Sequence, residues 1–315
     1  MHVCLDIRKV DFPLFDKPVV TLGSFDGVHL GHQVIIKRLL DKSKEKQRMG
    51  VVVTYEPHPQ SVVASLDAPK LLTTLEEKLK LLEGLGVEET VVMNFDDQLK
   101  EYSAEEFVRK ILVDKLKVGD LVVGEDHAFG KNRTGRIDLL KEVSSKYDFD
   151  VEIVSAFYVD DIRVSSSRIR REIKAGEFAH ALALLGHGYS VTGIVKRGKG
   201  RGKSLDYPTL NLEVSPIKLL PSDGVYSVGV QLEDQSYVGM MYIGPKPTFG
   251  EENRSVEVHV FGLEKDLVDA KVKILIERWV RGPMKFDDAQ QLKEQLKSDE
   301  KTIKQLYSNR WSKLY

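Results

Sequence analysis

Cysteine is almost absent from this sequence of 315 residues, in which Cys4 is the single example. One cysteine excludes an intrachain disulfide and a cysteine-based zinc site, and it fits a reducing compartment such as the cytoplasm. A net excess of charge is also absent, because 47 Lys and Arg residues oppose 48 Asp and Glu residues. There is therefore no overall basic field to attract nucleic acid or an acidic membrane surface.

Long apolar runs are missing as well. No run reaches the length needed to span a membrane, and the N-terminal segment lacks the continuous apolar core of a signal peptide. We therefore expect a cytoplasmic protein that binds neither a membrane nor nucleic acid. The residues that are present, 42% hydrophobic and 30% charged, make up the ordinary composition of a globular protein.

The length and the pattern of the chain predict two domains. A chain of 315 residues exceeds what one hydrophobic core usually supports. In residues 1–186, apolar runs alternate with helical patterns, which is typical of a parallel, doubly wound α/β sheet. In residues 187–315, short β-rich runs predict a small antiparallel barrel or sandwich, followed by a charged helix over residues 286–306. The strands predicted in the first half are residues 18–22, 51–55, 90–93, 121–123 and 151–154.

A glycine-rich loop, GSFDGVHLGH, joins the first predicted strand to its helix. Gly23 and Gly27 permit a tight turn and close approach of the backbone to a ligand. The helix that follows points free N–H groups and the positive end of its dipole into this turn. His29 and His32 are three residues apart, so both imidazoles can donate hydrogen bonds to a phosphoryl group that gains charge. The loop therefore predicts a nucleotide-phosphate site made by Gly23, Ser24, Phe25, Asp26 and Gly27, with His29 and His32 as catalytic side chains.

Two further segments of the first half carry polar groups at element ends. GEDHAFG, residues 124–130, follows a strand at the edge where open α/β sheets bind ligands, and its Asp126 can orient a ribose or a second substrate. RVSSSRIR, residues 163–170, places hydroxyls and arginines at a helix N-terminus, a combination that binds phosphate well. Taken alone, the first segment is also typical of any polar turn, and the second is more typical of an ordinary serine-capped helix with solvated arginines.

Together, GSFDGVHLGH, EPHP at residues 56–59, GEDHAFG and SSSRIR resemble, in this order, the prokaryotic bifunctional riboflavin kinase/FMN adenylyltransferase (FAD synthetase) family of HxGH nucleotidyltransferases. The resemblance begins at about Val19 and implies that the first half transfers AMP from ATP to FMN. It implies that His29 and His32 contact the phosphates of ATP. The further contacts to ATP and pyrophosphate that it implies are Asp126, Arg163, Ser166, Ser167 and Arg168, and the candidate flavin contacts are His58 and Phe129. His127 and Ser167 stand where the family usually has an aromatic residue and a threonine.

The second half opens with a basic, glycine-rich run, KRGKGRGK, at residues 196–203. A Walker A motif is excluded, because Arg197 stands where its first glycine is required and no helical pattern follows. A nucleic-acid patch is disfavoured, because no aromatic residues are interleaved. The run favours a flexible loop that closes over nucleotide phosphates. Its predicted contacts are Gly198, Gly200, Arg201, Gly202 and Lys203.

Two polar patterns follow this loop. Thr209 and Asn211 alternate by two, so on a strand their side chains share a face. Hydroxyl and amide oxygens suit Mg²⁺, which takes water and substrate phosphates as further ligands. In residues 255–261 the valines occupy one face and Glu257 the other, and a carboxylate beside Mg-bound ATP can deprotonate an attacking hydroxyl. A solvated polar strand face remains the alternative for both patterns.

The second half resembles the flavokinase module in the order of its motifs, from the basic loop through PTLN to the VEVH segment at residues 256–259. The resemblance implies that Thr209 and Asn211 bind Mg²⁺ with ATP and that Glu257 is the general base on the riboflavin 5′-hydroxyl. The usual LGFPTAN motif reads LDYPTLN here, so Asp206 and Leu210 depart from it. Arg281 and the predicted helix from Phe286 are candidates for covering the flavin.

The resemblance therefore implies phosphorylation of riboflavin to FMN in the second domain and adenylylation of FMN to FAD in the first, with ATP and Mg²⁺. Two alternatives stay open at this point. The second domain can be a flavin- or RNA-binding regulatory module on a single-activity nucleotidyltransferase. Alternatively, the first domain can use another acceptor, pantetheine phosphate or nicotinamide mononucleotide. No oligomeric state is predicted.

Overall fold

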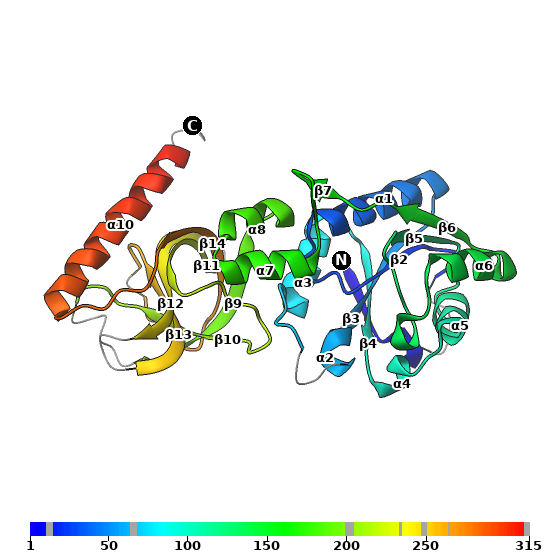
Figure 1. The fold of residues 1–315 in the computed structure, drawn as a ribbon, viewed down its shortest axis with the longest axis horizontal. Helices are drawn as coiled ribbons and strands as arrows, with labels where there is room; N and C mark the ends of the chain where they lie inside the picture. The colour runs from blue at the N-terminus through cyan, green and yellow to red at the C-terminus, as the bar shows by residue number, and fades with distance from the viewer. Residues whose placement is uncertain are drawn as a thin grey trace. The chain divides into compact units, whose positions relative to one another are not determined.

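The computed structural model describes residues 1–10, 15–63, 68–198, 205–232, 235–246, 251–263 and 265–311. It divides into two compact units, Met1–Ser166 and Ser167–Tyr315, which we describe separately (Figure 1). The division falls within the first turn of α7 (Ser166–Ala175), ahead of the boundary near Gly186 predicted from the sequence. None of the helices in these described stretches is long and apolar enough to cross a membrane.

The first unit is built on a sheet of six parallel strands in the order β1-β4-β3-β2-β5-β6. The doubly wound α/β prediction is confirmed. The strands are β1 (His2–Leu5), β2 (Val19–Leu22), β3 (Gly50–Glu56), β4 (Glu89–Asn94), β5 (Asp120–Gly124) and β6 (Asp150–Val154). β1 was not predicted from the sequence, because this edge strand buries only Cys4, leaves Leu5 69% exposed and so shows no apolar run.

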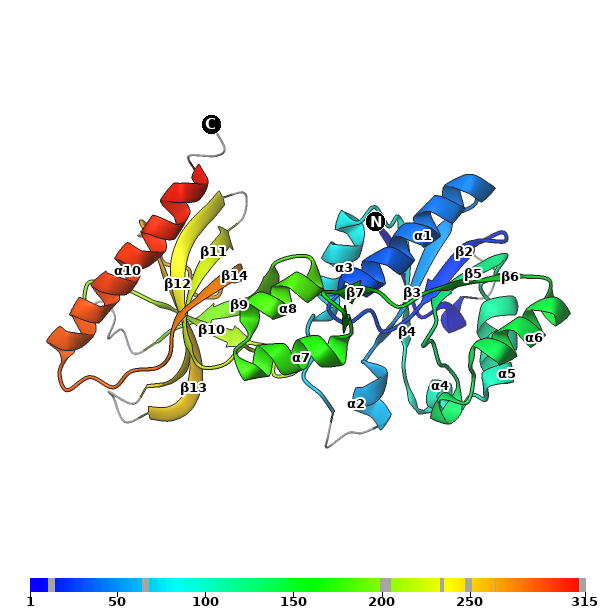
Figure 2. The ribbon, with the colours of Figure 1, turned by 45° about the horizontal axis from the view of Figure 1, so that its top comes forward.

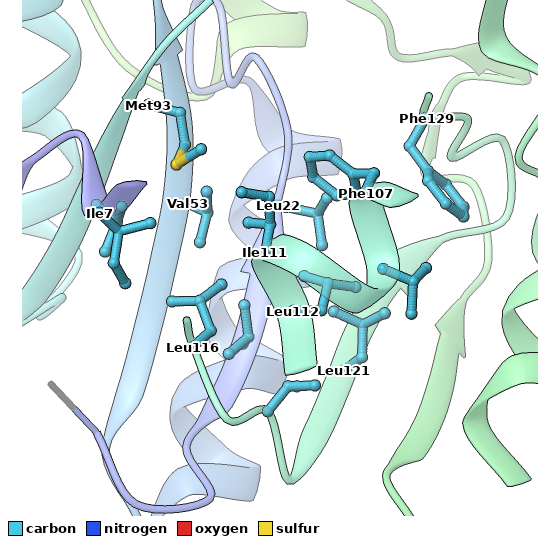
Figure 3. Packing of buried hydrophobic residues seen from close by; sticks show 14 of the residues in the cluster. Ile7, Leu22, Val53, Met93, Phe107, Ile111, Leu112, Leu116, Leu121 and Phe129 are labelled. Carbon is cyan, nitrogen blue, oxygen red and sulfur yellow. The ribbon is translucent and has the colours of Figure 1, made fainter. Parts of the chain in front are cut away.

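Helices pack on both faces of this sheet (Figure 2). The main helices are α1 (Leu30–Lys46), α2 (Pro59–Val63), α3 (Leu75–Gly84), α4 (Asp97–Lys100), α5 (Ala104–Phe107) and α6 (Ile137–Tyr147). A capping box of Ser103 and Glu106 starts α5, which changes after one turn into a π-helical segment, Val108–Val113. Because strand side chains alternate, Leu22 and Val53 pack under this segment (Figure 3), whereas Val52 packs under α1 and α3.

The strand order places a switch point at β2. From β2 the chain moves outward through β3 to β4, and it then returns to add β5 and β6 on the other side of β2. β2 and β5 are neighbours in the sheet, but the chain leaves β2 toward β3 on one side and leaves β5 toward β6 on the other. The loops at their carboxyl ends therefore run in opposite directions. In open α/β sheets such a crevice is where ligands bind.

The second unit is a closed six-stranded barrel in the order β10-β13-β12-β11-β14-β9, with antiparallel neighbours. This is the barrel form of the predicted antiparallel domain. Its strands are β9 (Tyr189–Lys196), β10 (Leu210–Val214), β11 (Gly224–Leu232), β12 (Gln235–Lys246), β13 (Glu251–Val260) and β14 (Lys271–Arg281). A short hairpin of β7 (Tyr158–Val159) and β8 (Ile162–Arg163) precedes α7 in the first unit.

Two helices, α8 (Phe178–Leu185) and α10 (Ala289–Trp311), pack against the barrel. In α8, Phe178 packs edge-on against Tyr189 and Tyr226 of the barrel. The C-terminal α10 lies along the outside of the barrel in Figures 1 and 2, and its Ile303 is fully buried against Val225, Met240 and Tyr207. The predicted charged helix is therefore present, and its apolar side covers one outer face of the barrel.

Candidate active sites

The loop after β2 has a strained backbone. Phe25 has φ 46°, Gly27 has φ 83° and Val28 has φ 39°. A β-branched residue in the left-handed region is a genuine outlier, and such strain persists only where surrounding contacts impose it. The contacts that impose it here come from Asp26 and from the segment before α3.

Asp26 is 2% exposed and serves as the anchor of this loop. Its carboxylate accepts hydrogen bonds from the backbone N–H groups of Leu72, at 3.0 Å, and Thr73, at 2.9 Å. The hydroxyl of Thr73 also donates to Asp26, at 3.2 Å, and accepts from the N–H of Gly27, at 3.0 Å. The carboxylate of Asp26 thus holds the loop in shape, and its contact with phosphate stays a prediction.

The two histidines of the loop lie together at the start of α1. His29 is the N-cap of the helix, and its Nδ1 accepts the backbone N–H of His32 at 3.3 Å. The two rings stack, with centroids 3.6 Å apart and planes inclined by 15°, and the ring of Phe25 packs edge-on against His32. With Nδ1 as the acceptor, a neutral His29 carries its proton on Nε2, where it can be donated.

His32 is held neutral. Burial, together with the nearby charges of His29 and Lys78, keeps the pKa of His32 well below its ordinary value. A neutral imidazole still donates one hydrogen bond. His32 can therefore act as a hydrogen-bond donor without carrying a formal charge.

Of the two later polar segments, the one at residues 163–170 contacts this loop through Ser166. The hydroxyl of Ser166 donates to the backbone carbonyl of Asp26, at 2.9 Å. The guanidinium of Arg163 lies 3.2 Å from Asp126, and both side chains are largely exposed. Ser167 and Arg168 belong to the second compact unit, in which Arg168 pairs with Glu172 one turn further along α7. The structure thus brings Ser166 to the first loop and pairs Arg163 with Asp126.

The candidate flavin contacts of the first unit are buried. His58 is 8% exposed, and its Nδ1 accepts the N–H of Gln60 at 3.1 Å. Phe129 packs within the hydrophobic core and tilts against Phe107 (Figure 3). The ring of His127 stacks on Phe129, burial lowers the pKa of His127 to about 4, and its Nε2 is buried without a hydrogen-bond partner within the described chain.

Sequence reasoning missed Lys78 of α3, which is 4% exposed beneath the first loop. Its ammonium donates to the carbonyl of Ser24 at 3.1 Å, to the hydroxyl of Thr54 at 2.9 Å and to the carbonyl of Tyr55 at 3.3 Å. Burial lowers the pKa of Lys78 to about 8. The available signal was its position, since Lys78 falls within the apolar stripe of its helix.

In the barrel, strand register brings the predicted kinase residues together. Asn211 of β10 lies directly opposite Glu257 of β13, which in turn lies opposite Tyr242 of β12. Residues directly opposite on neighbouring strands point to the same face, so these three form a row. Tyr242 packs with the cluster under α10, which shows that the row is on the outer, helix-covered face. Thr209 directly precedes β10.

The basic loop is described only at its beginning. Gly198 lies so close to Asn211 that a Cβ at this position would be 2.0 Å from the amide nitrogen Nδ2. A side chain at this position would therefore displace the Asn211 amide. The other predicted contacts of the loop lie outside the described residues, namely Gly200, Arg201, Gly202 and Lys203.

Ion pairs and hydrogen bonds tie α10 to both sides of this row. Arg281 at the end of β14 pairs with Asp299, which is 3% exposed, at 2.8 Å. On the other side, Asp206 pairs with Lys293 at 2.6 Å, and the hydroxyl of Tyr207 donates to Glu300 at 2.9 Å. The guanidinium of Arg281, a candidate flavin contact, is thus engaged with α10.

Known proteins share this two-part organisation. A family model described as FAD synthetase matches residues 13–168, and one described as riboflavin kinase matches residues 185–307. The bifunctional riboflavin kinase/FMN adenylyltransferase of Buchnera aphidicola subsp. Schizaphis graminum is 33% identical over 294 residues, which cover 92% of this chain and 94% of that protein. The protein of the same name from Escherichia coli (strain K12) is 32% identical over 294 residues, 92% of each chain.

A solved structure has the same fold over nearly the whole chain. It is named as a macrolide-efflux protein from Streptococcus pneumoniae, is 30% identical, and covers 96% of this chain and 99% of its own with a TM-score of 0.83. That name belongs to the neighbour alone. The match of the second half to a riboflavin kinase model argues against a purely regulatory module. The chain belongs to the bifunctional riboflavin kinase/FMN adenylyltransferase family, and it is an enzyme that makes FMN from riboflavin and FAD from FMN.

Proposed function

We propose that adenylyl transfer takes place where the loops after β2 and β5 diverge, with the strained first loop around the phosphates of ATP. The observation that carries this proposal is the stacked pair of His29 and His32 at the N-terminus of α1. The Nε2–H of His29, the free N–H groups of the helix and the helix dipole all favour an anion at this place. Arg163, Ser166 and Asp126 complete the polar surroundings.

The reaction at this site needs positioning and charge stabilisation. An oxygen of the FMN phosphate forms a bond to the α-phosphorus of ATP, while the bond from that phosphorus to pyrophosphate breaks. His29 and His32 donate hydrogen bonds to the oxygens on which negative charge grows. Neither imidazole forms a covalent bond, because holding the two phosphates in line supplies much of the rate.

The test uses the full chain with riboflavin, ATP and Mg²⁺. The His29→Ala variant is expected to form FMN at the normal rate and to form FAD at least 100-fold more slowly, since a preorganised donor is lost. Chromatography of the products separates the two steps, and the kinase activity of the same preparation is the internal control. Normal FAD formation by this variant would remove the first loop from the reaction.

We further propose that riboflavin phosphorylation takes place at the row formed by Asn211, Glu257 and Tyr242 on the outer face of the barrel. Glu257 takes the proton from the 5′-hydroxyl as that oxygen attacks the γ-phosphorus of ATP and ADP leaves. The opposition of Glu257 to Asn211 supports this assignment, because the base must lie beside the bound phosphates.

The donors at this row fit Mg²⁺. Thr209 and Asn211 offer hydroxyl and amide oxygens, and no group of three or more His, Cys, Asp or Glu residues within the described ranges could hold a metal alone. Mg²⁺ commonly binds to few protein oxygens and takes its other ligands from water and substrate phosphates. When bound through Thr209 and Asn211, it would neutralise charge on the phosphates of ATP.

The Glu257→Gln variant tests the kinase site. It is expected to phosphorylate riboflavin roughly 100-fold more slowly, as is typical when a general base is removed, and to convert supplied FMN to FAD normally. A variant that loses both activities while it remains folded would contradict the assignment of two separate sites.

A further inference from the structure

The carbonyl oxygen of Ser24 in the first loop is held from below by two donors. The ammonium of Lys78 donates to it at 3.1 Å, and the hydroxyl of Thr54 donates to it at 3.1 Å. Lys78 also binds Thr54 and the carbonyl of Tyr55, so the lysine joins the loop to the carboxyl end of β3. This carbonyl is therefore fixed in the direction of α3 and β3.

The direction of this carbonyl determines the direction of the next N–H. The peptide between Ser24 and Phe25 is trans, since the one cis bond in the described chain is Glu56–Pro57. In a trans peptide the C=O and the N–H point in opposite directions. The N–H of Phe25 therefore points away from Lys78, and no acceptor for it is found within the part of the chain that the structure describes.

The positive charge of Lys78 favours an anion at the first loop, as does its hydrogen bond to the carbonyl of Ser24. Asp26 of the loop and Glu56 of β3 are the acidic groups near the ammonium. The carboxylate of Asp26 is occupied by backbone donors of residues 72 and 73. The lysine also helps to lower the pKa of His32 in α1, which indicates that its positive potential reaches the imidazole pair. A potential that disfavours a charged imidazole favours a phosphate anion at the same place.

We propose that Lys78 is a positioning residue for adenylyl transfer, which turns the N–H of Phe25 toward the ATP phosphates and places a buried positive charge beneath the first loop. This inference rests on the proposed binding of phosphates by that loop. It extends the site to a helix that the motifs of the sequence did not include.

The first test compares Lys78→Met with Lys80→Met in the full chain. Lys80 is on the same helix, is 59% exposed and pairs with Glu76, so its variant is a matched control. Lys78→Met is expected to lower kcat/KM for ATP in FAD formation roughly 100-fold, as for the loss of a preorganised donor, with riboflavin phosphorylation unchanged. Lys80→Met is expected to leave both activities unchanged. Equal FAD formation by the two variants would overturn the proposal.

The second test separates charge from packing. The wild type is expected to lose kcat/KM for ATP above about pH 8, because burial lowers the pKa of Lys78 to about 8 beside Asp26, Glu56 and His32. Lys78→Arg keeps the charge at all these pH values, so it is expected to retain more activity than Lys78→Met and to show no loss between pH 8 and 9. An identical alkaline loss in the wild type and in Lys78→Arg would contradict the proposal.

The His29→Ala variant distinguishes a failure of this inference from a failure of the proposed function. If His29→Ala stops FAD formation but Lys78→Met does not, the first loop is the site and Lys78 has no part in it. If neither variant affects FAD formation, the proposed site itself is wrong.

Discussion

Removal of the Asp299 carboxylate is expected to detach α10 from the barrel. Asp299 is 3% exposed and accepts hydrogen bonds from Arg281, at 2.8 to 3.0 Å, and from Gln295, at 2.8 Å. In Asp299→Ala the guanidinium of Arg281, 18% exposed, keeps a bond to the carbonyl of Gly282 as its one remaining hydrogen bond to the described residues. The variant therefore leaves a largely buried positive charge without its counter-ion.

The size of the effect follows from the cost of such a charge. Removing one partner of a buried ion pair typically costs 3–5 kcal/mol, roughly, whereas replacing both partners by apolar residues is often neutral. For a unit of this size, each kcal/mol lowers the unfolding midpoint by about 2–4 °C. Asp299→Ala is therefore expected to lower the midpoint by roughly 6–20 °C. The double variant Arg281→Met/Asp299→Leu is expected to be close to the wild type.

Tryptophan fluorescence during thermal unfolding measures this effect selectively. The chain has two tryptophans, Trp279 and Trp311, and both belong to the second compact unit. The reasoning would be refuted if Asp299→Ala unfolded within 2 °C of the wild type, or if the double variant were less stable than Asp299→Ala. The KM for riboflavin of the double variant also tests the candidate flavin contact, because a direct role of Arg281 requires that KM to rise.

Two further perturbations follow from single contacts. Gly198→Ala is expected to push the Asn211 amide aside, since the new Cβ would lie 2.0 Å from its Nδ2. The kcat/KM for MgATP in the kinase reaction should then fall about tenfold, as when a residue that supports a metal ligand is changed. The rate of FAD formation from FMN should not change. His127→Phe should stabilise the first unit by about 1 kcal/mol, because it removes a buried nitrogen that lacks a partner. Since the pKa of His127 is lowered to about 4, the unfolded state binds more protons between pH 6.5 and 4, so the wild type loses stability as the pH falls through this range and the variant loses less. Unfolding midpoints by circular dichroism at pH 7 and pH 5 would contradict this if the two proteins shifted equally.

Buried strands and their connecting helices are predictable because their apolar pattern is local. The strands β2, β3 and β5 each contain a run of two or three consecutive buried apolar residues, and their side chains fill both faces of the sheet. β1 buries a single residue and depends on pairing with β4, in which each partner is 87 residues away in the sequence. Long-range pairing of this kind leaves no trace in a local pattern.

The same difference between local and long-range features applies to the candidate sites. Groups proposed to bind ligands through the backbone of a loop, such as those near His29, are marked by glycine and by spacing. Side chains that act through partners distant in sequence are not. The pairing of Arg281 with Asp299 and the place of Phe129 in the core cannot be inferred from their own segments, and their contact with flavin stays a prediction.

Asp206 and Leu210 of the LDYPTLN segment depart from the family motif, and the structure shows where each side chain lies. Asp206 stands where the family has glycine and adopts φ 64°, in the left-handed region that glycine reaches freely and aspartate tolerates better than most residues. Its carboxylate faces Lys293 of α10. Leu210 lies opposite the fully buried Val258, on the face of the strand away from Asn211. Neither side chain therefore displaces a member of the row, and Asp206 adds an exposed ion pair between its segment and α10.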